Sequence, residues 1–267
     1  MMTYFLDSDF HSDDIYAPVN RLTVRSPKHD EVHLLKEKLV IPKCRGSIKR
    51  PRLSDLLERS GGQFPATLVS GRAGTGKTVM ASAFAKNFNH VAWYAVESTD
   101  AEWKVFANYF ASSVLRAVGS RLKAREFVPG DGDSSQASIA AFLIDVLAEA
   151  ETMLLHRPLL IVLDGIHHLF DAPWFGQFFG LLLSSLPGNS TLLVLCRSKP
   201  PSPLWRLRSK QQLNVIDEKV LAFDLAETAR LMTKLGLRRA DAERAHSTTF
   251  GRASKLTEYA ERLWSRT

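Results

Sequence analysis

The residues best suited to chemistry lie together at positions 71–78, in the sequence GRAGTGKT. This stretch matches the pattern G-x-x-x-x-G-K-[ST] at every fixed position. Its glycines let the backbone curl so that successive N–H groups face one concavity, which can hold the α- and β-phosphates of a nucleotide. Lys77 can reach the β- and γ-phosphates, and the Thr78 hydroxyl can bind Mg²⁺. The stretch therefore predicts a phosphate site made of Gly71, Arg72, Ala73, Gly74, Thr75, Gly76, Lys77 and Thr78.

Two further residues follow apolar runs that are typical of buried strands. Asp164 ends the run LLIVLD, and an acid at the carboxyl end of such a strand is the expected second ligand of the magnesium ion. Arg197 follows the run TLLVLC, where a guanidinium group could contact the γ-phosphate and distinguish ATP from ADP. We therefore assign the catalytic roles to Lys77, Asp164 and Arg197, and the metal to Thr78 and Asp164.

The residue after Asp164 bears on hydrolysis. A carboxylate or glutamine usually orients the attacking water, and in sites of this type the residue after the magnesium aspartate often supplies it. Here that residue is Gly165, which has no side chain, and His167 and His168 follow. A histidine near a strand end is more often structural. The sequence therefore predicts slow or absent hydrolysis.

The elements that position these residues alternate along the chain. Apolar runs predict strands at 66–70, 90–96, 159–164 and 191–196, and a weaker one at 211–216. Stripes at helical spacing fall between them, at 53–57, 79–84, 103–115 and 139–146. After Leu221 only helical patterns occur, the first ending at Gly236 and another spanning 256–263. This order predicts an α/β fold with a doubly wound, mostly parallel sheet and a small C-terminal helical subdomain.

Composition sets the domain plan and the broad class of protein. The 267 residues are 45% hydrophobic and 24% charged, which excludes a wholly disordered or collagen-like chain. We predict a poorly ordered extension at 1–34, a nucleotide-binding domain at 35–220 and a helical subdomain at 221–267. No apolar run reaches 18 residues, and the acidic N-terminus lacks the features of a secretory signal. Two isolated cysteines, Cys44 and Cys196, fit a reducing cytoplasm, so we expect a cytoplasmic protein without membrane contact.

The charge distribution leaves other classes of function open. Residues 1–196 carry 20 basic and 20 acidic side chains, whereas residues 197–267 carry 15 basic and 8 acidic ones. A basic region can meet the phosphates of nucleic acid, but its charges are scattered and no recognition-helix pattern is present. We therefore do not expect direct DNA binding, although a nucleic-acid-binding protein remains an alternative. A true ATPase or phosphotransferase is the other alternative, and it would need a water-orienting residue elsewhere.

Several segments together resemble the MalT-like STAND NTPases, the ATPase module of large LuxR-type transcriptional regulators. They are KLVIPKCRGSIKRPRLSDLLER before the phosphate loop, VAWYAVESTDAEWKVFANYF, LLIVLDGIHHL, LLVLCRSKPPSPLWRLRSKQQLNVI and LAFDLAETARLM. The similarity covers residues 36–265. It implies a bacterial signalling module that binds ATP or ADP with Mg²⁺ and uses their exchange as a switch, possible partners being another protein or a second copy.

The resemblance also implies roles for individual residues, and this sequence differs from the family pattern at some positions. It implies that 48–50, in particular Ile48 and Arg50, border the adenine, and that Arg197 is the sensor. Gly165 replaces the second acid of the family's strand-end motif, and Ala253 replaces the proline of its Gly-x-Pro motif. The sensor-repeat and DNA-binding domains of such regulators do not occur within these 267 residues, so regulator activity does not follow from these residues alone.

Overall fold

The computed structural model describes residues 35–44, 46–120 and 136–265. The expected extension at 1–34 lies outside these residues. Within them, no helix is long and apolar enough to cross a membrane.

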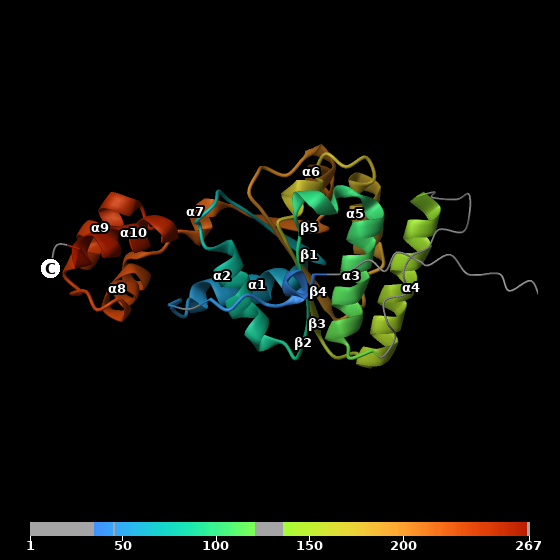
Figure 1. Ribbon diagram of the computed structural model, residues 1–267, viewed down its shortest axis with the longest axis horizontal. Helices are drawn as coiled ribbons and strands as arrows, with labels where there is room; N and C mark the ends of the chain where they lie inside the picture. The colour runs from blue at the N-terminus through green and yellow to red at the C-terminus, as the bar shows by residue number, and fades with distance from the viewer. Residues whose placement is uncertain (1–34, 45, 121–135, 266–267) are drawn as a thin grey trace, which may run out of the picture. The chain divides into compact units, whose positions relative to one another are not determined.

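A five-stranded parallel sheet forms the centre of the described chain (Figure 1). Its strands are β1 (Ala66–Ser70), β2 (His90–Ala95), β3 (Leu159–Asp164), β4 (Ser190–Cys196) and β5 (Leu213–Ile216), in the order β2-β3-β4-β1-β5. Because all strands are parallel, their carboxyl ends share one edge. Ser70 pairs with Cys196, and Asp164 pairs with Leu195. The register therefore brings the ends of β1, β4 and β3 side by side.

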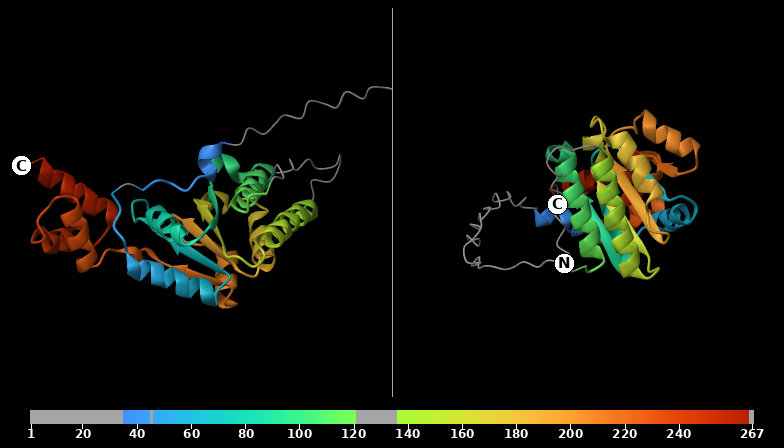
Figure 2. Two further views of the ribbon diagram at one scale, coloured as in Figure 1. Left: turned by 90° about the horizontal axis from the view of Figure 1, so that it is seen from below. Right: turned by 90° about the vertical axis from the view of Figure 1, so that its right-hand side faces the viewer.

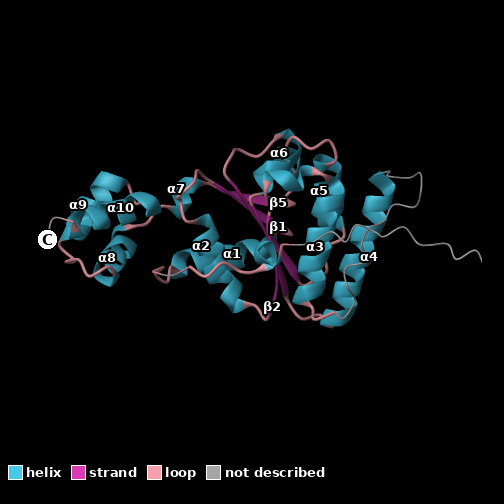
Figure 3. Ribbon diagram, in the orientation of Figure 1, coloured by secondary structure: helices cyan, strands magenta, loops and turns pink. Residues whose placement is uncertain are grey.

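Helices cover both faces of the sheet (Figure 3). This is expected because the strands are apolar along both faces and do not alternate with polar residues. Alternate residues of each strand face opposite cores: Leu68 and Ile161 belong to one cluster, Val69 and Val162 to the other. The first cluster also contains residues of α3 (Trp103–Ala117), α4 (Gln136–Leu154), α5 (Phe175–Ser184) and α6 (Ser202–Ser209). The second contains residues of α1 (Pro51–Gln63) and α2 (Lys77–Phe84). Figure 2 shows the two layers of helices with the sheet between them.

The last part of the described chain is helical. It consists of α7 (Glu218–Leu221), α8 (Leu225–Lys234), α9 (Asp241–Thr249) and α10 (Ala253–Trp264). The last three helices bury a cluster of their own, around Phe223, Met232 and Leu256. This cluster is separate from the two that flank the sheet, because it shares no buried residue with either of them.

The expected α/β architecture is confirmed, and the structure differs from the sequence patterns in detail. Four short 3-10 turns complete the elements: η1 (Lys36–Leu39), η2 (Ala85–Asn87), η3 (Ser98–Ala101) and η4 (Ile166–Leu169). Helices α5, α6 and α9 were not predicted. Helix α1 also extends beyond the stripe predicted at 53–57 and continues through Gly61 and Gly62.

Candidate nucleotide-binding site

The loop at 71–78 joins β1 to α2 at the carboxyl edge of the sheet. Gly74 and Gly76 have φ values of 75° and 90°, a left-handed conformation that favours glycine. The Thr75 hydroxyl donates a hydrogen bond of 2.9 Å to the carbonyl of Arg72, which closes the turn from within. The strand-loop-helix context that the motif requires is therefore present.

Lys77 lies at the first position of α2 and is 7% exposed. Its ammonium group donates to the carbonyls of Gly71 and Arg72, and to the Thr75 hydroxyl at 3.3 Å. No carboxylate among the described residues lies within ion-pair distance of it. Burial lowers the pKa of Lys77, partly opposed by the charge of Asp164. A buried cation held only by neutral oxygens fits a site for an anion.

Thr78 and Asp164 are brought together as predicted, although they are 86 positions apart. The Thr78 hydroxyl donates a hydrogen bond of 2.7 Å to an Asp164 carboxylate oxygen. Burial raises the pKa of Asp164, and the hydrogen bond from Thr78 and the charge of Lys77 oppose that shift. No group of three His, Cys, Asp or Glu side chains that could hold a metal occurs in the described ranges. A hydroxyl and a carboxylate suit Mg²⁺ that takes its remaining ligands from phosphates and water.

The backbone conformation and surroundings of position 165 favour glycine. Its φ is 94°, and a Cβ atom there would overlap the carbonyl oxygen of Val96, at the end of the neighbouring strand. A second acid therefore has no room at this position. His167 follows in η4. Burial and then the nearby charges, including those of Arg197 and Lys77, lower its pKa to about 4, and its buried Nδ1 has no partner among the described residues.

Arg197 lies one residue beyond β4, between the strands that carry the phosphate loop and Asp164. Its side chain is exposed. Its charge opposes the rise that burial causes in the pKa of Asp164, and adds to the fall that burial causes in the pKa of Lys77. The position is compatible with the predicted sensor role, and the contact itself stays a prediction.

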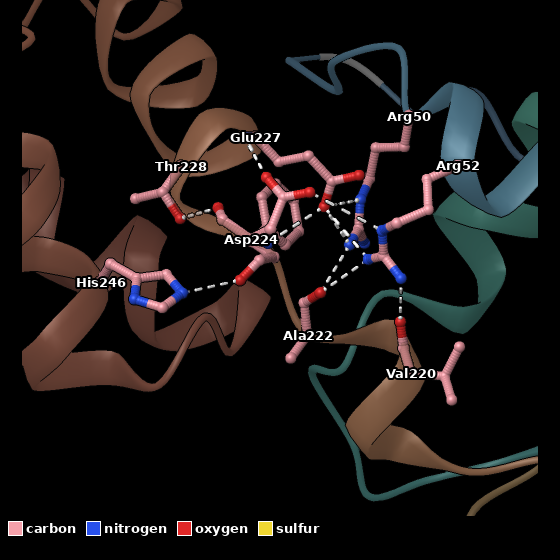
Figure 4. A network of polar contacts seen from close by, with 9 residues as sticks. Arg50, Arg52, Val220, Ala222, Asp224, Glu227, Thr228 and His246 are labelled. Atoms are coloured by element: carbon pink, nitrogen blue, oxygen red, sulfur yellow. Dashed lines mark hydrogen bonds and ion pairs between the residues drawn. The ribbon is translucent and has the colours of Figure 1, made fainter.

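The expected adenine-bordering segment contacts the helical region. Ile48 packs against the cluster of α8–α10. The Arg50 guanidinium lies 3.9 Å from the ring centroid of Phe223 and 2.6 Å from a carboxylate oxygen of Glu227 (Figure 4). Arg52 reaches the same oxygen at 3.3 Å. Burial alone would raise the pKa of Glu227, but the hydrogen bonds and charges of the two arginines outweigh it and lower that pKa.

The phosphate loop also receives contacts that sequence reasoning did not identify. The Ser254 N–H, in the first turn of α10, donates to the Gly74 carbonyl at 3.0 Å. Arg252 donates to the Ala73 carbonyl at 2.8 Å. Glu218, which begins α7, accepts the Arg72 N–H at 3.0 Å. The side-chain hydrogen bond from Arg72 is the main reason why the pKa of Glu218 is lowered.

Two of these contacts leave no room for larger residues in the loop. A Cβ on Gly71 would lie 2.8 Å from the Glu218 Cβ, and a Cβ on Gly74 would lie 2.7 Å from the Ser254 Cβ. The sequence pattern could not reveal this, because the partners are about 146 and 180 positions away.

Comparison with known families shows the family to which this chain belongs. The AAA ATPase domain family matches residues 49–195, more than half of the chain. The chain belongs to this family. P-loop ATPases of this kind generally bind ATP or ADP with Mg²⁺. The resemblance to MalT-like STAND P-loop NTPases found in the sequence is confirmed as well, because a MalT protein and a STAND protein are among the proteins to which this chain is similar.

Three relatives illustrate the match. The HTH-type transcriptional regulator MalT of Vibrio parahaemolyticus is 28% identical over 188 residues, which cover 70% of this chain and 20% of that protein. A Walker-type ATPase of Pyrococcus abyssi shares the fold with a TM-score of 0.53 at 14% identity, covering 81% of this chain and 67% of that one. A STAND protein with a tetratricopeptide repeat sensor from Pyrococcus horikoshii shares the fold with a TM-score of 0.50 at 18% identity. The match covers 82% of this chain and 30% of that one. The chain thus spans about a fifth of the MalT relative.

Proposed function

We propose that this chain is an ATP/ADP switch module in signalling or transcriptional regulation, with slow hydrolysis. In this proposal residues 35–220 bind the nucleotide and residues 221–267 form the helical subdomain that responds to it. The proposal rests on two hydrogen bonds. Arg252 donates to the carbonyl of Ala73, and the Ser254 N–H donates to the carbonyl of Gly74. A change in the loop on nucleotide binding would be felt directly at the start of α10.

The roles of individual residues follow from their geometry. The loop N–H groups and the N-terminus of α2 would hold the phosphates, and the Lys77 ammonium would exchange its carbonyl partners for phosphate oxygens. Thr78 and Asp164, already joined at 2.7 Å, would bind Mg²⁺ together. When bound, Mg²⁺ would neutralise phosphate charge. Arg197 would contact the γ-phosphate, and Ile48 and Arg50 would border the adenine.

Slow ATP hydrolysis agrees with the interactions that the carboxylates around the site already make. Gly165 cannot be replaced by an acid without displacing Val96. Asp164 is engaged by Thr78, and Glu218 is engaged by Arg72. Neither of these two carboxylates is therefore free to orient water. We expect hydrolysis well below the ~1–100 s⁻¹ typical of kinases.

The setting we propose is the cytoplasm of a bacterium, since both cysteines are free thiols. A partner protein or a second copy of the chain would read the state of the helical subdomain. We do not propose direct DNA binding by this chain.

The test is a titration of the purified chain with a fluorescent ATP analogue and Mg²⁺. In Lys77→Ala the affinity should fall by about 10- to 150-fold, because a charge-assisted contact worth about 1.5–3 kcal/mol is lost. Lys210→Ala, an exposed lysine beyond α6, is the matched control and should bind like the wild type. Unchanged affinity in a folded Lys77→Ala variant would reject the proposal. Phosphate release at kinase-like rates would instead favour an active ATPase.

A further inference from the structure

A cavity lies beside β2, an edge strand of the sheet. Its volume is about 800 Å³. It is lined by α2 with η2, the start of β2, the end of α3, residues 39–44 and residue 47. This volume is in the range of pockets that enclose small organic molecules.

The cavity is separate from the phosphate loop. On this side its wall includes Val79, Ser82 and Ala83, which are spaced i, i+3 and i+4 along one stripe of α2, followed by Lys86 in η2. The buried face of α2, which includes Met80 and Phe84, packs elsewhere, against the core. From Lys77 to Lys86 the helical rise amounts to about 13 Å. The stripe thus leads from the phosphate end of α2 to its far end.

The charges around the cavity have one sign. Lys43, Lys86 and Arg116 are exposed and line it, whereas no aspartate or glutamate among the described residues does. None of the three cations forms an ion pair with a described residue. The rest of the wall is largely apolar and includes Ile41, Phe88 and Val91. Such a lining suits a molecule with an apolar body and a negative head group.

A buried hydroxyl in the wall supports a ligand independently. Ser82 is 4% exposed, and its Oγ has no hydrogen-bond partner among the residues that the structure describes. Nearly all buried polar side chains in proteins find a partner, so an unsatisfied hydroxyl at a cavity wall requires an explanation. A ligand would supply one if the Ser82 side chain, whose Oγ is shielded here, turned into the cavity and donated to it.

We propose that this cavity binds a small amphipathic anion, a carboxylate or phosphate monoester on an apolar body. The head group is held by Lys43, Lys86 and Arg116 with the Ser82 hydroxyl, and the apolar body packs against Ile41, Phe88 and Val91. The site is additional to the nucleotide site and does not depend on it.

Binding to the full chain is measured by isothermal titration with octanoate and with octyl phosphate, below their micellar concentrations. Octanol and octylamine carry the same apolar body without the negative charge. One or both anions should bind at least tenfold more tightly than either control, and the stronger anion identifies the preferred head group. Saturating Mg²⁺-ATP should leave this affinity unchanged.

The double variant Lys86→Glu/Arg116→Glu should bind the anions at least tenfold more weakly, since it reverses two of the three charges. Lys210→Glu, the matched charge reversal away from the cavity, should bind like the wild type. Equal affinity for octylamine, unchanged affinity in a folded double variant, displacement by Mg²⁺-ATP, or no binding of either anion would each overturn the proposal. The nucleotide site is untouched by these variants, so Mg²⁺-ATP binding in them checks the proposed function separately.

Discussion

Arg197 is exposed at the end of β4 and, unlike Lys77, is not buried among loop carbonyls. A guanidinium at this place is expected to contact only the γ-phosphate, which ADP lacks. Arg197→Ala should therefore weaken ATP binding by about tenfold or more and leave ADP binding nearly unchanged. Titration of wild type and variant with both nucleotides measures this. An equal loss for ATP and ADP, or no loss for either, would make Arg197 a structural or surface residue.

His167 gives the site a pH dependence. Its folded-state pKa is about 4, against an ordinary value of 6.5. Between these values the unfolded chain takes up a proton that the folded chain does not, so the stability of the folded state falls as the pH is lowered from about 6.5 to about 4. In His167→Asn this contribution is absent, and the free energy of unfolding should depend less on pH in that window. Urea denaturation at pH 7, 6 and 5 provides the comparison; parallel pH profiles would refute the assignment.

The sequence predicted the phosphate loop and its link to Asp164 because these depend on local pattern and on strand ends. It could not predict why Gly165 is glycine, since the reason is the Val96 carbonyl on another strand. It also did not predict that Arg50 binds Glu227, which is 177 positions away. The pattern Asp224-x-x-Glu227 is a capping box at the start of α8, and it could have marked Glu227 as a structural residue.

At the level of elements, the segment before α1 is joined to α8 through the buried carboxylate of Glu227, which is 1% exposed. Arg50→Ala removes its main partner at 2.6 Å, while Arg52 remains at 3.3 Å. We expect the free energy of unfolding to fall by about 3 kcal/mol, the lower end of the range for a broken buried ion pair. Thermal or urea denaturation followed by circular dichroism measures the change.

Arg52→Ala is the matched control for this prediction. The Arg52 side chain is 42% exposed, so its removal should cost at most about 1 kcal/mol. If Arg50→Ala costs no more than Arg52→Ala, the buried ion pair does not hold α8 in place.

The elements that the sequence did not predict have physical reasons. Helix α5 contains Gly176 and Gly180 within an otherwise apolar run, which suits a strand as well as a helix. Helix α6 begins beside Pro200, Pro201 and Pro203, which indicate a loop although proline is also favoured in a first helical turn. Helix α9 buries only Ala242, Ala245 and Thr249, too little for an amphipathic pattern. Strands β1, β3 and β4 were predictable because both of their faces are buried.

At the level of the whole molecule, the phosphate loop is held from two directions. β1 and α2 form it, and the helical region contacts its outer side through Glu218, Arg252 and Ser254. Sequence reasoning predicted that a helical subdomain follows the sheet, but not that the start of α10 contacts the loop. Such a contact can couple two sites only if it differs between the two nucleotide states.

Hydrogen exchange of the Ser254 amide tests this coupling most directly, because that N–H donates to the Gly74 carbonyl. The full chain is compared with saturating Mg²⁺-ATP and with saturating Mg²⁺-ADP. Protection at Ser254 should differ by about fivefold or more between the two, the low end of typical allosteric coupling, and the difference should vanish in Arg197→Ala. Equal protection in both nucleotides, in a wild-type chain that binds both, would contradict the account of this module as a switch.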